Sequence, residues 1–279
     1  MLQLQKIIIN SFIEELKRAF QKNYGNTEAD ALEFLAWAGD LALENIANCD
    51  ALYHNVEHTI MVVAAGQQVL RGKHMLDKDV GVRDWLQVIM ALLYHDIGYV
   101  RGICQADNEH RYASGVDGQI VEIPPGGTDA ALAPYHVDRG KLFIRERFSG
   151  GIPLELDLDA ITSYIEMTRF PVPDEGFYKN TTNYAGLVRA SDLIGQLADP
   201  DYLRKIPALF YEFEETGANK KTGYKNPENM RRSYADFYWN AIDPYIQEAL
   251  RYLRITAEGK EWVASLYAHV FAVEHGQRG

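Results

Sequence analysis

The sequence lacks the features that mark secreted and membrane proteins. It has only two cysteines, Cys49 and Cys104, with no CxxC pair and no disulfide framework, which favours a reducing compartment. No segment approaches the ~20 consecutive apolar residues of a membrane span. The N-terminal stretch MLQLQKIIINSFIEELKRAF does not resemble a signal peptide, because its apolar run is short and charges follow it quickly. We therefore expect a soluble, cytoplasmic protein with no membrane partner.

Positive charge is also scarce. Lys and Arg number 28 against 39 Asp and Glu, which gives a formal net charge of -11. An acidic chain repels a polyphosphate backbone, so we do not expect a nucleic-acid polymer as a partner. A small phosphate ester remains compatible with this charge if a bound divalent metal offsets the negative field.

Hydrophobic and aromatic residues, by contrast, are plentiful. They include 17 Tyr, 11 Phe and 4 Trp, enough for a real core rather than a disordered chain. Apolar residues recur at helical spacing, and no repeat, heptad seam or long linker divides the chain, so we predict an all-α fold in a single domain, residues 1–279. The helices are expected at residues 5–24, 26–47, 54–72, 82–98, 137–148, 156–170, 184–198, 200–216, 228–254 and 258–276.

Two of the predicted helices and one loop frame the residues that carry chemistry. The third helix is expected to stop at Gly72, and the fourth is apolar on nearly every side, which is typical of a central buried helix. Residues 99–134 are rich in Gly, Pro, Asp and Asn, and the stretch GQIVEI within them predicts a short strand or one arm of a β-hairpin. A loop this long is uncommon and usually functional, so we expect a lid or a wall.

Two histidines stand four residues apart in the sequence YHNVEHT. Residues at this spacing share one helix face, so His54 at the start of the third helix and His58 one turn later would reach one cavity. The alternative interpretation is that each imidazole satisfies a backbone carbonyl or is exposed. The spacing alone leaves the two interpretations about even.

The sequence LLYHDIGY places His95 and Asp96 at the end of an apolar helix. Adjacent helical residues point about 100° apart, so the pair can meet one ion only where the backbone turns, and Gly98 allows such a turn. Unpaired buried charge is costly, and a cation would compensate it. The alternative is that Asp96 caps the following turn.

A further carboxylate, Asp192, lies among leucines in LVRASDLIGQLA, although Asp is a poor residue inside a helix. The alternative for this residue is an ion pair with Arg189, three residues earlier. Together the motifs offer two histidines and two carboxylates from three helices. Mixed N and O ligands suit Mn, Fe, Co, Ni or Zn, with Mg also compatible, and leave positions open for water and substrate.

The order of these motifs resembles the H…HD…D pattern of the HD-domain metal-dependent phosphohydrolase superfamily, over roughly residues 53–200. The flanking helices, residues 1–50 and 201–279, resemble nothing we can name. The resemblance implies an HD-type helical fold and hydrolysis of a small phosphorylated metabolite or nucleotide by a metal-activated water, with Asp96 also orienting that water or bridging two ions. It assigns the metal-ligand positions to His58, His95, Asp96 and Asp192.

The HNxxH element also resembles the cyclic-nucleotide phosphodiesterase branch of this superfamily. In that branch the first histidine is a general acid rather than a ligand, a role that would fall on His54. This chain departs from the branch after its His-Asp pair, where Tyr99 and Val100 replace another His and a Pro-Gly. The departure weakens the assignment of a cyclic-nucleotide substrate.

A second metal ion is implied by other members of the superfamily, which carry further histidines on the next helices. His136 matches the first of them, but Thr168 stands where the next would fall. A second ion would need His136, water, a bridging Asp96 and a contribution from His110 in the loop. The resemblance therefore leaves the count at one or two ions.

Phosphate binding requires cationic partners, and Arg101 and Lys141 beside the loop are the candidates we favour, in that order. For each of them a surface ion pair is the alternative. Tyr99 borders the same loop and would either stack on a base or pack. Two rival functions remain open, a di-iron oxygenase and a non-catalytic metal-binding regulatory module, and the C-terminal helices are either core or the face of a homodimer.

Overall fold

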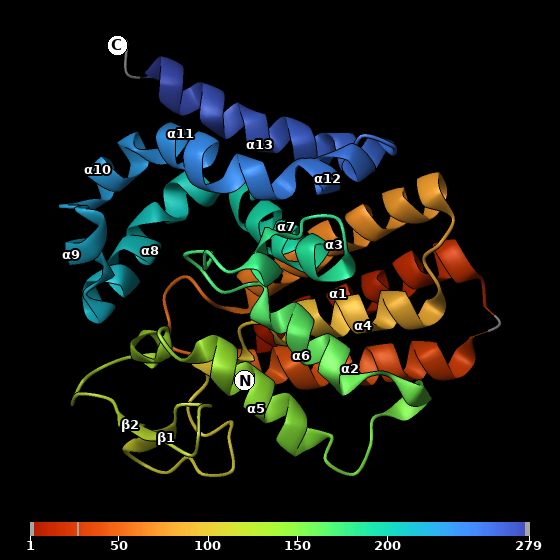
Figure 1. Ribbon diagram of the computed structural model, residues 1–279, viewed down its shortest axis with the longest axis horizontal. Coiled ribbons are helices and arrows are strands. Elements are labelled where there is room, and N and C mark those ends of the chain that lie inside the picture. Colours follow the sequence, from red (N-terminus) through yellow and green to blue (C-terminus); the bar gives the residue numbers. More distant parts are fainter. Residues whose placement is uncertain (1–2, 27, 277–279) are drawn as a thin grey trace.

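The predicted apolar periodicities correspond to helices in the computed structural model, which describes residues 3–26 and 28–276 (Figure 1). The prediction of an all-α single domain is confirmed, and so is the small hairpin in the loop. The helices are α1 (Gln3–Tyr24), α2 (Ala29–Ile46), α3 (Val56–Asp77), α4 (Val82–Tyr94), α5 (His136–Arg147), α6 (Leu158–Glu166), α7 (Tyr184–Leu197), α8 (Tyr202–Thr216), α9 (Ala218–Thr222), α10 (Pro227–Arg232), α11 (Tyr234–Phe237), α12 (Asp243–Leu253) and α13 (Ala257–Gly276). None of these helices combines the length and apolar character that a membrane span requires.

Helix α4 is the central helix of the fold, as its sequence predicts. Every residue from Trp85 to Tyr94 is buried, and α2, α3, α6 and α7 pack around it. Tyr94 uses its hydroxyl within this core, where it donates to the carbonyl oxygen of Ala38 at 2.8 Å. The helix therefore ends, at its C-terminus, inside the protein rather than at the surface.

A close crossing of α3 and α7 fixes the relative position of two candidate ligands. A Cβ atom added at Gly195 would lie 2.5 Å from Cα of Val62, so the two backbones meet at a point where no side chain fits. His58 lies one turn before Val62 on α3, and Asp192 lies one turn before Gly195 on α7. Gly195 thus brings together the two helices that hold His58 and Asp192.

The boundaries of the third predicted helix are wrong at both ends. Helix α3 begins at Val56, because the side chain of Asn55 caps it by accepting the amides of Glu57 and His58, so His54 precedes the helix. The helix also continues past Gly72 to Asp77. Gly72 does not stop it; a Cβ there would lie 2.1 Å from the carbonyl oxygen of Tyr252, so this glycine permits packing against α12.

The long predicted helix at 228–254 is also divided. It forms α10, α11, a π-helical turn at Tyr238–Ile242 and α12, and the short α9 precedes it where only a turn was expected. These segments cover one side of the molecule together with α13, while the hairpin lies on the opposite side (Figure 1). Local periodicity therefore predicted helical character here but not the breaks.

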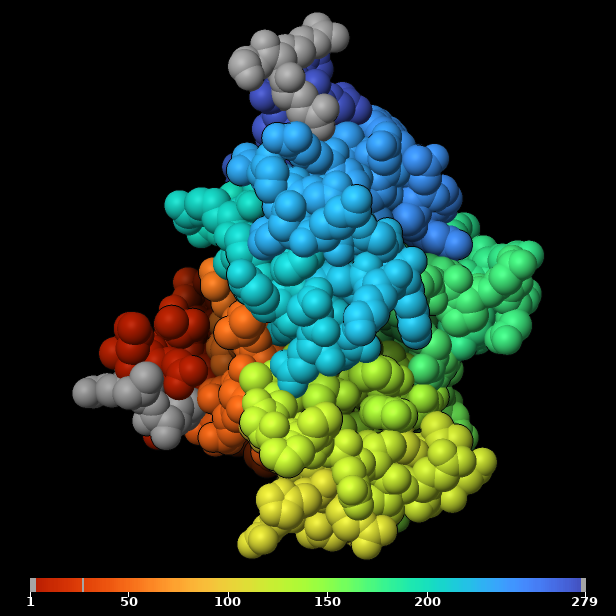
Figure 2. Space-filling view, turned by 90° about the vertical axis from the view of Figure 1, so that its left-hand side faces the viewer, coloured from red at the N-terminus to blue at the C-terminus, as the bar shows by residue number. Residues whose placement is uncertain are grey.

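The loop at 99–134 is built as a fixed wall. It contains short 3-10 turns, Ile97–Tyr99 and Asp129–Leu132, and the predicted hairpin, in which β1 (Arg111–Ala113) pairs antiparallel with β2 (Ile120–Glu122). Figure 2 shows this yellow-green segment directly below the cyan of α8 and its neighbours. Glu215 of α8 accepts the Thr128 amide at 2.6 Å, which joins the two surfaces.

Arg139 of α5 anchors the loop from inside the protein. Its guanidinium is fully buried, pairs with Asp107 at 2.9 Å, and donates to the carbonyl oxygens of Gly98, Val100 and Ala113. A buried charge held by a partner and by several carbonyls is a costly arrangement to disrupt. The loop is therefore better described as a wall than as a free lid.

Candidate metal centre

The four residues of the H…HD…D motif meet at one buried point between α3, α4 and α7. Oδ2 of Asp96 lies 3.2 Å from Nε2 of His58 and 3.0 Å from Nε2 of His95, and the two Nε2 atoms are 3.4 Å apart. Oδ1 of Asp192 lies 3.8 Å and 3.6 Å from the same two nitrogens. Side chains from sequence positions 58 to 192 thus converge, as the motif predicts.

The distances among His58, His95 and Asp96 and the donor types fit a divalent ion, and Asp192 lies slightly farther out. Ligand atoms held about 2.1 Å from one ion lie roughly 3.0–3.4 Å from each other. Oδ2 of Asp96 is fully buried, and its only close polar neighbours among the described residues are the imidazole nitrogens of His58 and His95, which are themselves metal-ligand atoms. Nδ1 of His95 lies 2.7 Å from the carbonyl oxygen of Leu92, the kind of contact that orients a metal-bound imidazole. These residues could therefore hold a metal.

The electrostatics of the cluster point in the same direction. Burial raises the pKa of Asp96, but the neighbouring His95 and His54 lower it by a larger amount. The pKa of Asp96 is therefore well below its usual range. Burial lowers the pKa of His95, while Asp96 and Asp192 raise it to about 9. A proton on His95 thus balances the carboxylates, and a divalent cation would replace that proton on binding.

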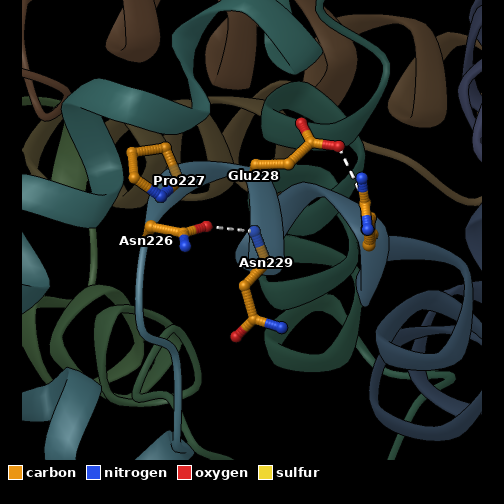
Figure 3. Close-up of a pocket in the computed structure, with 5 residues that line it drawn as sticks. Asn226, Pro227, Glu228 and Asn229 are labelled. Atoms are coloured by element: carbon orange, nitrogen blue, oxygen red, sulfur yellow. Dashed lines mark hydrogen bonds and ion pairs between the residues drawn. The ribbon is translucent and has the colours of Figure 1, made fainter.

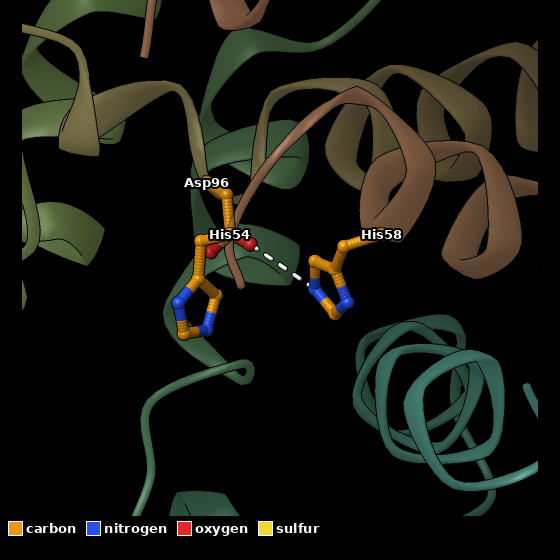
Figure 4. Close-up of side chains that lie close together, drawn as sticks. All are labelled: His54, His58 and Asp96. Carbon is orange, nitrogen blue, oxygen red and sulfur yellow. Dashed lines mark ion pairs between the residues drawn. The ribbon is translucent and has the colours of Figure 1, made fainter. Parts of the chain in front are cut away.

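His54 lies beside this cluster but makes a different contact. Figure 4 shows His58 directed at Asp96, with His54 close to the same carboxylate and joined to it by no ion pair. Nδ1 of His54 lies 2.5 Å from Oε2 of Glu212 instead. Burial lowers the pKa of His54, but Glu212 and Asp96 raise it to about 9. The imidazole is thus kept in its protonated form.

Glu212 is the functional residue that the sequence did not reveal. It lies on α8, in the C-terminal region that resembled nothing, and its side chain is 3% exposed. Besides the ring of His54, its carboxylate accepts the backbone amides of Tyr53 at 2.6 Å and His54 at 3.2 Å. In the sequence it is only an acidic residue between Tyr211 and Phe213 in a helix, and this pattern does not indicate which residue it contacts.

His136 is the first residue of α5 and faces the other oxygen of Asp96. Its Nε2 lies 3.7 Å from Oδ1 of Asp96, and its Nδ1 lies 2.6 Å from the carbonyl oxygen of Ala133. Burial lowers the pKa of His136 to about 4, so the imidazole is neutral, the form that binds metals.

Thr168 is buried and donates to the carbonyl oxygen of Ile165, while His110 is exposed on the loop.

The backbone turns at Gly98, as the sequence predicts, but a positive φ is not the reason. Gly98 lies in a 3-10 turn, and a Cβ there would lie 1.9 Å from the carbonyl oxygen of His136. The missing side chain lets the N-terminus of α5 approach the turn that follows Asp96. Gly98 therefore serves the site by bringing His136 to it.

The predicted phosphate partners are engaged elsewhere. Arg101 pairs with Asp50 and Asp129, each at 2.5 Å, and Lys141 pairs with Asp138 and Glu166. No ion pair joins either cation to the metal cluster among the residues that the structure describes. Their roles in substrate binding stay predictions.

Arg189 does not pair with Asp192, so that alternative is wrong. Its guanidinium is buried, donates to the carbonyl oxygen of Tyr178 at 2.7 Å, and lies 4.3 Å from the ring centre of Tyr245. Asp192 is therefore free to face the histidines. Arg189 is instead a structural contact between α7, α12 and the preceding loop.

A separate surface pocket lies at the start of α10 (Figure 3). It has a volume of about 540 Å³ and is open to solvent. Its polar groups already serve the short helix: Asn226 accepts the Asn229 amide at 2.7 Å, and Glu228 pairs with Arg232 at 2.8 Å. It shares no residue with the histidine and aspartate cluster.

Fold and site together define an all-helical protein with a buried histidine and aspartate cluster that could hold a metal ion. More particularly, the chain belongs to the Npun_R2479-like family, whose profile matches residues 2–276. No curated protein sequence matches the chain. The family match extends over nearly the whole chain, well beyond residues 53–200.

Proposed function

We propose that this protein is an HD-type metal-dependent phosphoric ester hydrolase that acts on a small phosphate ester or nucleotide. The observation that carries the proposal is the convergence of four ligand atoms on one buried point, one from each member of the H…HD…D pattern. Two of the side chains come from a His-Asp pair at the end of the central helix, as the resemblance implies.

Each group of the site has a proposed task. A bound divalent cation would supply hydroxide near neutral pH, because it lowers the pKa of a water molecule. Asp96 would orient the attacking water from the middle of the cluster. His54 would donate a proton to the leaving oxygen, since Glu212 holds its Nδ1 and leaves Nε2 available.

Phosphate recognition is assigned to Arg101 and Lys141. Both now form ion pairs with carboxylates, and one of the two partners of Arg101, Asp129, is buried. A phosphate oxygen can replace the exposed carboxylate of Asp50 at little cost, while Asp129 would keep the guanidinium of Arg101 in place. Arg101 is the first candidate because it follows the His-Asp motif by five residues and borders the wall.

Metal analysis followed by a substrate screen tests the proposal. Purified protein is expected to carry Mn, Fe, Co, Ni, Zn or Mg, and to hydrolyse members of a phosphomonoester and phosphodiester panel when Mn, Mg or Ni is supplied. Asp96→Ala is expected to lose metal and hydrolysis together. Metal-loaded protein that hydrolyses no member of the panel would contradict the proposal and favour a regulatory module.

A di-iron oxygenase is the second candidate, and the position of His136 favours it. Its Nε2 faces Oδ1 of Asp96 while the other ligands face Oδ2, an arrangement suited to a carboxylate that bridges two ions. Thr168, where a further histidine ligand would fall, counts against it. About two irons per chain together with oxygen consumption would support this candidate over hydrolysis.

A further inference from the structure

Tyr99 stands between two histidines of the site. Its ring stacks on that of His54 with centroids 4.5 Å apart and an angle of 13°, and on that of His136 at 4.6 Å and 27°. The side chain is 4% exposed. Because two imidazoles stack on this buried ring, the ring is not available to a nucleobase, which removes the base-stacking role considered for Tyr99.

Distance alone does not keep His54 away from a metal. A ring nitrogen of His54 and ligand atoms of His58 and Asp96 all lie within 4.8 Å of one another, so these three side chains form a possible ligand group themselves. A modest rotation of the His54 ring would therefore be enough to add a ligand. What opposes the rotation is the set of contacts that the ring makes.

Two contacts at right angles fix the ring of His54. Glu212 holds one edge through Nδ1 at 2.5 Å, which fixes the rotation of the ring within its own plane. Tyr99 lies flat against one face, which fixes the tilt of that plane. The backbone amide of His54 also donates to Glu212, so the chain segment that carries the ring is anchored as well.

We propose that Tyr99 is a positioning residue that keeps His54 out of the metal's coordination sphere, so that its free nitrogen remains available to the substrate. The proton-donor role of His54 rests on the proposed function; its exclusion from the metal does not. Tyr99 comes three residues after Asp96 in the same turn, so one short segment supplies both a ligand and the ring that keeps a neighbouring histidine from becoming one.

The test compares ligand sets in Co²⁺-loaded protein by visible absorption and magnetic resonance, which report coordination directly. In the wild-type background, His54→Ala is expected to leave the Co²⁺ spectrum unchanged. Tyr99→Leu is expected to change the spectrum, and the double variant Tyr99→Leu/His54→Ala to restore the wild-type form. Tyr99→Phe keeps the ring and is expected to keep the spectrum.

Activity gives a second readout. Tyr99→Leu is expected to lower kcat about 100-fold with little change in KM, as loss of a general acid does, while Tyr99→Phe restores turnover. Tyr112→Leu is the matched control, because Tyr112 is a buried tyrosine of the same loop that is not stacked on a histidine. If Tyr99→Leu does not fold, Tyr99→Met replaces it in both readouts.

Two results would overturn the inference. One is a change in the wild-type Co²⁺ spectrum on His54→Ala, which would make His54 a ligand. The other is a spectrum of Tyr99→Leu that His54→Ala does not alter. Absence of phosphate ester hydrolysis in the wild type would reject the proposed function, while the spectra would still decide the role of Tyr99.

Discussion

At the scale of single residues, Asp96 lies at the centre of the candidate metal cluster. One of its oxygens faces His58 and His95, and the other faces His136. Removing a charge from the centre of such a cluster leaves the surrounding imidazoles without their main counter-charge. A substitution at Asp96 should therefore affect metal binding, whereas a substitution at His54 should affect proton transfer.

Asp96→Asn is expected to lower metal affinity by at least about 100-fold with little change in shape, because the amide cannot replace an anionic ligand. His54→Ala is expected to keep the metal and lose turnover. Metal titration by calorimetry measures the first effect, and kcat on a hydrolysed ester measures the second. Loss of metal in His54→Ala would instead make His54 a ligand.

Glu212→Gln tests the partner that sequence alone missed. The carboxylate raises the pKa of His54 against the effect of burial, so its removal should lower that pKa from about 9. We expect the NMR titration of His54 to move to lower pH, and kcat to fall about 10- to 100-fold with metal content unchanged. Glu215→Gln, one turn further along α8 and bonded to Thr128, is the matched control.

The candidate metal ligands were predictable because His58, His95 and Asp96 lie in local motifs, to which the resemblance in motif order adds Asp192. His54 and His58, and His95 and Asp96, lie within a few residues of each other, and their types and spacing carry the signal. Glu212 acts on His54 across 158 positions in the sequence. No periodicity or spacing connects two such positions, so only the fold could reveal the contact.

At the scale of elements, glycines set how closely helices cross. Gly195 at the crossing of α3 and α7 allows backbone contact with Val62. From the sequence, such a glycine looks the same as one that ends a helix, which is why the predicted helix end at Gly72 is wrong. Helix existence was predictable from apolar spacing, while helix ends and crossings depended on tertiary contacts.

Gly195→Ala is expected to lower the free energy of unfolding by about 1–3 kcal/mol, because its Cβ would lie 2.5 Å from Cα of Val62. By shifting His58 away from Asp192, it should also weaken metal binding. Urea unfolding and metal titration measure the two effects. Gly150→Ala is the control, since a Cβ there meets nothing within 4 Å; equal effects in both variants would contradict the argument.

At the scale of the whole molecule, an ion network ties α5, α6 and the loop that follows them. Glu166 pairs with Lys141 and Arg169, and it accepts a hydrogen bond from Tyr178 at 2.6 Å. Burial raises the pKa of Glu166, but Arg169, Lys141 and Tyr178 together lower it by a larger amount, to about 2. A carboxyl group with a depressed pKa in the folded state stabilises the fold only while it is ionised.

The network should therefore make stability depend on pH in the acid range. The contribution of Glu166 is fully present above its ordinary pKa of 4.5 and is lost as the pH falls from there towards 2. Relative to Glu166→Gln, the wild type should lose about 2 kcal/mol of unfolding free energy across that window, allowing for solvent screening. Urea titrations at neutral and acidic pH test this, with the exposed Asp159→Asn as the control.

The contact between Glu212 and His54 shows how much of the chain is needed to complete the candidate site. A fragment ending at residue 200 would keep all four ligand residues and still leave the imidazole of His54 without its partner. Binding a metal and using it would then be separable properties, carried by different lengths of polypeptide. The C-terminal helices, which the family match also covers, therefore contribute a residue to the candidate site.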